Sequence, residues 1–145
     1  MSTFAAPLRV FGNTKEGASA DVGDVIAMQT NTIDFNDTTK NLFWLPPNAQ
    51  VIDFNVDITT AFDAGTTNTL DLGTAAIPTL FADDLALGAA VRVLASSDAS
   101  QLPNYADTGT SAIQVQAVYA QTGGAATAGA ARITVIYAAR KVLPA

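Results

Sequence analysis

The strongest constraint on the fold is a stretch of strict alternation between residues 50 and 60. Apolar and polar residues alternate over eight positions, with Ile52, Phe54, Val56 and Ile58 on one face and Asp53, Asn55, Asp57 and Thr59 on the other. A period of two residues is typical of a β-strand with one buried face and one face in water. We therefore expect an antiparallel sheet, because the strands of a parallel sheet are buried on both faces.

Shorter segments of the same kind recur along the chain and are separated by residues that favour turns. We expect further strands at residues 25–30, 32–35, 42–45, 69–72, 91–94, 112–120 and 131–138. The linker 121–129 is rich in Gly, Ala and Thr, so we expect the last two strands to form a hairpin. This series of short strands predicts an all-β fold, an antiparallel β-sandwich of jelly-roll or Ig-like layout, and we favour the jelly-roll-like one.

Two other parts of the chain depart from this pattern. Residues 76–90 hold the one plausible helical turn, in which Thr79 would cap a helix that starts after Pro78, so at most one short helix is expected. Residues 1–24 contain one proline and three glycines and show no sustained periodicity. They predict an extended N-terminal arm, with one short strand around residues 8–11, ahead of a β-sandwich domain over residues 25–145.

Composition excludes several classes of function. The 145 residues include no cysteine and no histidine, which removes disulfides, cysteine-ligated zinc, cysteine nucleophiles and histidine relays. The net charge of −6 argues against a nucleic-acid partner, because phosphate binding needs concentrated Lys and Arg. No run approaches the roughly 20 apolar residues that cross a bilayer, and the N-terminus has no readable signal peptide. We expect synthesis in a cytoplasm and no membrane partner.

One tripeptide, Asp107-Thr108-Gly109, matches the catalytic motif of aspartic proteases, in which two such aspartates share a proton. In that family an apolar strand precedes the motif, whereas here residues 96–105 are polar and include Pro103. A structural interpretation is a loop turn in which Asp107 accepts hydrogen bonds from backbone amides and Gly109 takes a positive φ. We favour the turn over the protease.

Other acidic residues suggest weaker possibilities. Asp53 and Asp57 share a strand face, but at 3.3 Å per residue they stand about 13 Å apart, beyond the roughly 5–9.5 Å of glycosidase pairs. Oxygen ligands for calcium are offered in or near loops by Asp63, Asn68, Asp71, Asp83, Asp84 and Asp98. The loop at 63–68 does not match an EF-hand, and Asp is also this chain's commonest turn residue. We expect no metal, no cofactor and no catalytic residue.

Candidate interface residues are aromatic or apolar. Trp44 with Phe43, just before Pro46, would anchor a partner or, alternatively, fill the core at a strand end. The arm adds Phe4, Leu8, Val10 and Phe11. The 28 alanines bury little area each, so we expect self-association to supply further buried surface.

Three segments resemble a known family. Residues 55–76 read NVDITTAFDAGTTNTLDLGTAA, Phe81-Ala82-Asp83 follows, and residues 127–137 read TAGAARITVIY. This order resembles the small virion proteins of tailed bacteriophages, in particular the capsid decoration (cement) proteins, over roughly residues 48–138. The resemblance implies a β-sandwich without catalytic residues, which sits as a trimer on three-fold or quasi-three-fold positions of an icosahedral shell and ties capsomers together.

The expected function follows from the strands, the missing catalytic residues and this resemblance. We expect a homotrimer on the exterior of the virion that binds the phage major capsid protein and stabilises the assembled shell by mass action. The residues expected at the interface are Phe4, Leu8, Val10, Phe11, Phe43 and Trp44. The alternatives are a tail, neck or fibre-base protein, a carbohydrate-binding β-sandwich module, and a small enzyme built on Asp107.

Overall fold

The computed structural model describes residues 25–139. The arm predicted over residues 1–24, with Phe4, Leu8, Val10 and Phe11, lies outside the described residues. Eight strands make up most of the described chain: β1 (Val25–Asp34), β2 (Thr39–Leu45), β3 (Ala49–Thr60), β4 (Thr67–Gly73), β5 (Ala82–Ala86), β6 (Arg92–Leu94), β7 (Ile113–Thr122) and β8 (Ala130–Ala139).

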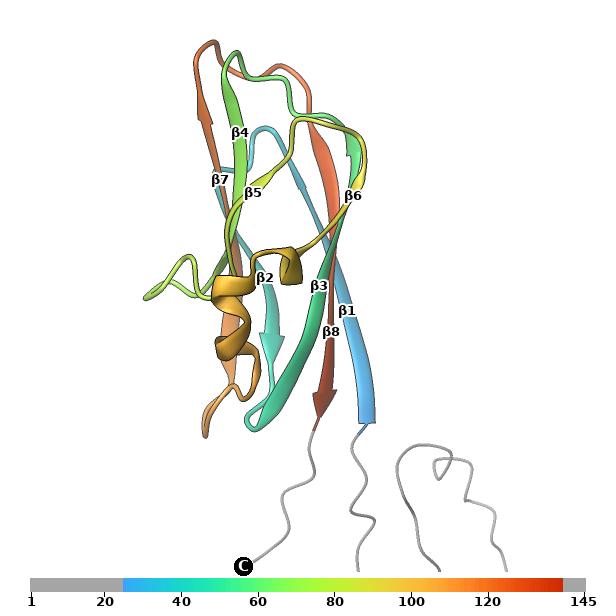
Figure 1. The fold of residues 1–145 in the computed structure, drawn as a ribbon, viewed down its shortest axis with the longest axis vertical. Coiled ribbons are helices and arrows are strands. Elements are labelled where there is room, and N and C mark those ends of the chain that lie inside the picture. The colour runs from blue at the N-terminus through green and yellow to red at the C-terminus, as the bar shows by residue number, and fades with distance from the viewer. Residues whose placement is uncertain (1–24, 140–145) are drawn as a thin grey trace, which may run out of the picture.

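The strands form two four-stranded antiparallel sheets packed face to face (Figure 1). Sheet A has the order β1-β8-β3-β6 and sheet B the order β2-β7-β4-β5. In sequence, the first strand pairs with the eighth, the second with the seventh, the third with the sixth and the fourth with the fifth. This is the pairing of a chain folded in half and rolled up, so the prediction of an all-β, jelly-roll-like antiparallel sandwich is confirmed.

The predicted hairpin between the last two strands is wrong. β7 pairs with β2 and β4 in sheet B, whereas β8 pairs with β1 and β3 in sheet A. The linker 121–129 therefore crosses from one sheet to the other. A flexible linker permits either path, and the long-range pairing of the two strands decides between them.

Side chains from the inner faces of both sheets meet in one core. It includes Phe54 and Val56 from β3, Leu70 and Leu72 from β4, Val115 from β7, and Ile133 and Val135 from β8, all with no exposed surface. Phe54 packs against Phe81 with ring centroids 5.1 Å apart, and Tyr105 meets both rings edge-on. The Tyr105 hydroxyl donates to the Phe81 carbonyl over 2.9 Å.

The alternation in β3 holds for Phe54, Val56 and Ile58, which are buried, but the prediction for Ile52 is wrong. The register against β8 shifts between Val51 and Asp53, so one extra residue is inserted at this point. A bulge of this kind breaks the period of two. Val51 consequently takes the inward position, and Ile52 is exposed.

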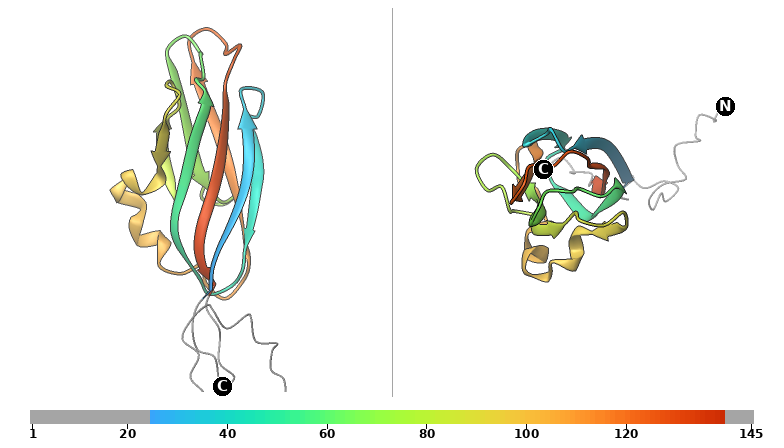
Figure 2. Two further views of the ribbon diagram at one scale, coloured as in Figure 1. Left: turned by 90° about the vertical axis from the view of Figure 1, so that its right-hand side faces the viewer. Right: turned by 90° about the horizontal axis from the view of Figure 1, so that it is seen from above.

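The short helix lies elsewhere than predicted. Residues 76–90 form loops and β5, because Leu85 and Ala82 pair with β4 and are buried against the core. The helical stretch consists of two 3₁₀ segments, η2 (Ala95–Ser97) and η3 (Ala99–Tyr105). Asp98 caps the second by accepting from the Ser100 amide, a signal present in the sequence. Figure 2 shows this stretch on one flank of the sandwich.

No helix among residues 25–139 is both long and apolar enough to cross a membrane.

Candidate functional site

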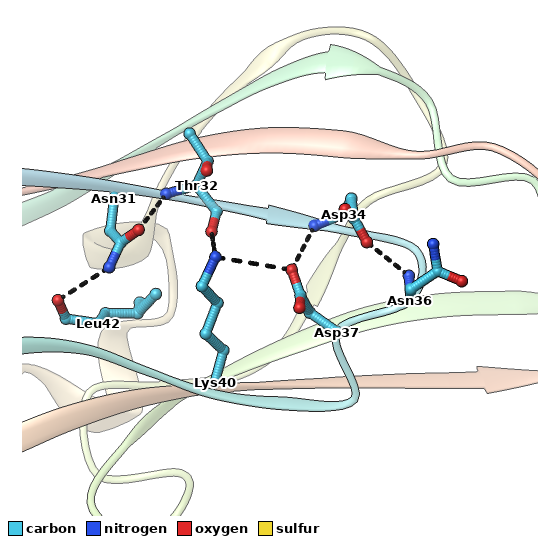
Figure 3. A network of polar contacts seen from close by, with 7 residues as sticks. All are labelled: Asn31, Thr32, Asp34, Asn36, Asp37, Lys40 and Leu42. Atoms are coloured by element: carbon cyan, nitrogen blue, oxygen red, sulfur yellow. Dashed lines mark hydrogen bonds and ion pairs between the residues drawn. The ribbon is translucent and has the colours of Figure 1, made fainter.

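One open side of the sandwich, between edge strands β1 and β2, is closed by side chains. Gln29 donates to the Trp44 carbonyl over 2.8 Å, and Asn31 donates to the Leu42 carbonyl over 3.1 Å. In the other direction, Lys40 donates to the Thr32 carbonyl over 2.6 Å (Figure 3). The carbonyl oxygens of Leu42 and Trp44 on the edge strand β2 therefore already accept hydrogen bonds from β1.

The outer face of sheet A carries an exposed apolar patch, which we call the sheet A patch. Ile26 and Met28 on β1 are 55% and 67% exposed, and Ile52 on β3 is exposed as well. Ile136 of β8 lies opposite Met28 and completes the patch. The left view in Figure 2 looks onto this face, with β3, β8 and β1 side by side.

The character of this face changes along the strands. Thr30 and Thr134 share a hydrogen bond of 2.9 Å in the next row, and Arg132 pairs with Asp57 at 3.0 Å in the row after. Arg92 lies opposite Asp57 in that same row. Residues 25–139 contain ten aspartates but only three cationic residues, and two of those three lie on this face. Arg92 and Arg132 therefore offset part of the negative charge on this face.

The sheet A patch lies at the end of the sandwich where the described chain begins and ends. Val25 and Ala139 are register partners in neighbouring strands. Sequence reasoning missed Ile26 and Met28 as surface residues. Counting back in twos from the buried Ile33 places Asn31, Gln29 and Ala27 inward, and therefore Met28 and Ile26 outward. This period of two, counted from one core residue, was the signal in the sequence.

The Phe43-Trp44 pair divides between core and surface. Phe43 is only 3% exposed and packs in the core, so the prediction of Phe43 as an interface residue is wrong for the single chain. Trp44 points to the other side of β2 and is 59% exposed, so the alternative that it fills the core is wrong for Trp44. Successive residues of a strand face opposite sides, which accounts for the split.

Trp44 borders an open groove of about 360 Å³ on the outer face of sheet B. The floor is β7, where Gln114 lies opposite Trp44 and Gln116 lies opposite Asn41. The far wall is the loop at 74–76, which begins directly after Gly73. All lining residues are uncharged: Asn41, Trp44, Thr74, Ala75, Ala76, Ala112, Ile113, Gln114 and Gln116.

Gly73 gives this groove its shape. Gly73 on β4 is the register partner of Gln116 on β7, and Asn41 on β2 is the partner on the other side. Glycine has no side chain that could cover the side-chain amide of Gln116. A Cβ at this position would stand 2.2 Å from the Ile77 carbonyl oxygen and 2.4 Å from that of Pro78. Only glycine therefore allows the loop at 74–78 to pass so close to β4.

The protease-like tripeptide serves as a turn, as favoured from the sequence. Asp107 accepts from the Gly109 amide over 2.7 Å, and Gly109 has a φ of 90°. The Thr108 hydroxyl donates to the Pro46 carbonyl and accepts from the Ala49 amide, at 2.8 and 3.0 Å. These bonds tie the loop to the connection between β2 and β3.

The loop carboxylates have mostly structural partners. Asp63 accepts from the Thr127 hydroxyl and from the amides of Thr127 and Ala128, and these hydrogen bonds lower its pKa, the hydroxyl contributing most. The carboxylates of Asp71, Asp83 and Asp84 converge within 4.8 Å, an arrangement with the oxygen chemistry of a cation site.

The carboxylates of β3 have structural partners too. Asp53 accepts from the amide and hydroxyl of Ser96, and Asp57 is held by Arg132. Asp53 and Asp57 lie on the polar face of β3 that the alternation predicted, and these bonds give both carboxylates a structural role there.

Two solved structures share this fold. One is a chain of the cyanophage Pam1 capsid asymmetric unit, with a TM-score of 0.57, 17% identity, and coverage of 88% of this chain and 97% of that chain. The other is a chain of the acidic stable capsid structure of Helicobacter pylori bacteriophage KHP30, with a TM-score of 0.57, 20% identity, and coverage of 82% and 91%. No protein-family model and no curated protein matches the sequence.

Proposed function

We propose that this chain is a structural protein of a phage virion, and more specifically a decoration protein that binds the major capsid protein on the outside of the shell. The observation that carries the proposal is the alignment of the jelly-roll-like sandwich with chains in two phage capsid structures. Both alignments cover more than nine tenths of the matched chain, so the counterpart in each capsid is a small subunit of similar length.

The sheet A patch is the surface proposed for self-association into a homotrimer. Each copy carries a net charge of −6, so association is opposed by charge repulsion over most of the surface. Sheet A combines exposed apolar side chains at one end with Arg92 and Arg132 farther along, and these two cationic residues lower the repulsion between copies at this face. Apolar surface of this kind supplies the buried area that an alanine-rich core lacks.

The N-terminal segment is proposed to contact the shell, through Phe4, Leu8, Val10 and Phe11. It joins the sandwich at Val25, and 24 residues can reach at most roughly 80 Å when extended. Phe4 lies 21 residues before Val25 and Phe11 lies 14, so their extended reaches are about 70 and about 46 Å.

The test is the thermal stability of purified shells with and without the protein. A ligand that binds only the assembled state raises its melting temperature, and the shift grows with the logarithm of ligand concentration. We expect such a shift with the full chain and a smaller one with Phe4→Asp plus Phe11→Asp. Equal melting temperatures at saturating protein would contradict the decoration role.

A tail, neck or fibre-base position remains the alternative within the same virion class. Electron microscopy of particles separates the two directly. We expect density for the protein on the shell surface at three-fold or quasi-three-fold positions, and density confined to the tail or neck would favour the alternative.

A further inference from the structure

We propose that the groove beside Trp44 is a binding site for a neutral carbohydrate. This function is separate from shell binding and rests on a different face of the molecule. The groove lies on sheet B, whereas the surface proposed for self-association lies on sheet A. Its volume of about 360 Å³ is within the range of small-molecule sites, about 300–1,000 Å³.

The first observation is the exposed indole. Trp44 is 59% exposed on a sheet face and is one of the residues that line the groove. An aromatic ring presents a flat apolar face with a negative quadrupole, which attracts the weakly positive C–H groups on one face of a sugar ring. An exposed aromatic ring with a few polar groups beside it in a groove is the usual composition of a small-molecule site.

The second observation is a set of side-chain amides without protein partners. Asn41, Gln114 and Gln116 line the groove, and their side-chain amides make no hydrogen bond with any residue among 25–139. Gln116 is 9% exposed and lines the groove, and its register partner Gly73 has no side chain that could cover it. Within residues 25–139 the one fully buried side-chain polar atom without a partner is Asn55 Oδ1, so the Gln116 amide reaches water in the groove. A ligand hydroxyl can take the place of that water.

The chemistry of the lining selects the class of ligand. No charged residue lines the groove, which disfavours phosphate, carboxylate or basic ligands. Each primary amide both donates and accepts, and a sugar hydroxyl does the same, so neighbouring hydroxyls can satisfy amides from two directions. The Thr74 hydroxyl adds another such group at the far wall.

A peptide strand is the rival occupant, and the edge of β2 argues against it. An added strand would need the free carbonyls of β2 for pairing. The carbonyls of Leu42 and Trp44 already accept from Asn31 and Gln29. The side chains at the groove are thus available to a ligand, while the backbone beside them is not.

The chain carries its own reporter for the test, because Trp44 is its single tryptophan. The full-length protein is titrated with a panel of neutral oligosaccharides built from glucose, galactose, mannose or N-acetylglucosamine, and indole fluorescence is followed. We expect a saturable change with at least one of them. Gln116→Met keeps the size of the side chain and removes the amide, and should weaken binding about tenfold. Gln101→Met, on η3, is the matched control and should bind as the wild type does.

Calorimetry tests the tryptophan itself, since Trp44→Ala abolishes the fluorescence signal. We expect Trp44→Ala to lose binding and Trp44→Phe to retain a weaker form of it, both with unchanged thermal melts. The proposal is overturned if no sugar in the panel gives a saturable change at tens of millimolar, or if Gln116→Met and Trp44→Ala bind normally. It is equally overturned if Trp44→Ala abolishes shell binding while no sugar binds, because the groove would then be a protein contact. Loss of shell binding by the arm variants leaves the sugar titration unaffected, so the two proposals fail separately.

Discussion

The side-chain amide of Asn31 on β1 donates to the carbonyl oxygen of Leu42 on β2, and this bond joins the two sheets along one open side of the sandwich. β1 and β2 are edge strands of different sheets, so no backbone ladder can connect them. Gln29 repeats the contact two residues away at Trp44. Unpaired edge groups are templates for further strands, and these two amides block them.

Removing either amide is therefore expected to have two effects. Asn31→Ala and Gln29→Ala should each lower the free energy of unfolding by about 1 kcal/mol, the usual net value of one hydrogen bond. The double variant should also aggregate more readily, because two β2 carbonyls become free. Urea denaturation and light scattering measure the two effects. Asn36→Ala is the matched control, since the Asn36 side chain makes no hydrogen bond within residues 25–139, and a loss as large there would refute the assignment.

Tyr105 anchors the helical flank to the core through its hydroxyl. Burial, followed by the charges of Asp53 and Asp98, raises the pKa of Tyr105, so the hydroxyl stays protonated and keeps donating to Phe81. Tyr105→Phe leaves the buried carbonyl without this partner and should cost about 1–3 kcal/mol of unfolding free energy. The Tyr137 hydroxyl accepts a 3.2 Å hydrogen bond from Gln29, and Tyr137→Phe should lower the free energy of unfolding by less. Equal costs for the two variants would contradict this account.

Asp83 is expected to weaken the fold when ionised. Desolvation, then the charges of Asp84, Asp71 and Asp98, raises its pKa. An acid with a raised pKa holds its proton more tightly when folded, so stability falls as the pH rises from the unfolded value, about 3.9, through the folded one. Asp83→Asn should raise the melting temperature near neutral pH and change little well below that window. A melting temperature that is unchanged at neutral pH would contradict the expectation that the ionised Asp83 destabilises the fold.

Asp63 should behave in the opposite way. Its pKa is lowered by the Thr127 hydroxyl first and then by the Ala128 and Thr127 amides. The stability from these bonds is fully present above the unfolded value, about 3.9, and is lost as the pH falls through the lower folded value. Asp63→Asn should therefore lower the melting temperature near neutral pH, with the difference from wild type shrinking in acid. Thermal melts across pH provide the measurement, and a pH-independent difference would argue against a charge effect.

The sheet A patch is testable by a single charge. Met28→Asp places a carboxylate among Ile26, Ile52 and Ile136, and should reduce the mass in solution to that of a monomer. Val91→Asp is the matched control, because Val91 is a similarly exposed apolar residue outside the patch. Sedimentation or light scattering reads the mass. If the wild type is already monomeric at high concentration, or if Met28→Asp leaves an oligomer intact, self-association through this patch is refuted.

The sequence by itself determined the class of fold and much of its local geometry. The period of two identifies the strands, and it assigns Phe54, Val56 and Ile58 to the core because the pleat of a strand is a local property. The turn at Asp107 was predictable for the same reason, since both the acceptor and the glycine lie within the tripeptide.

Only the tertiary structure decided which strands are neighbours. The linker 121–129 leads across the sandwich, and residues 82–86 are drawn into a strand by Leu70 and Leu72, although their local pattern also suits a helical turn. A bulge opposite Ile136 turns Ile52 outward. Trp44 and Gln116 are far apart in sequence, and their meeting in one groove depends on β2 pairing with β7. The energy of strand pairing is a sum over long-range contacts, and a local sequence pattern does not encode these contacts. The local pattern therefore determines which face of a strand is buried, whereas the packing of the sheets determines which strands and side chains become neighbours.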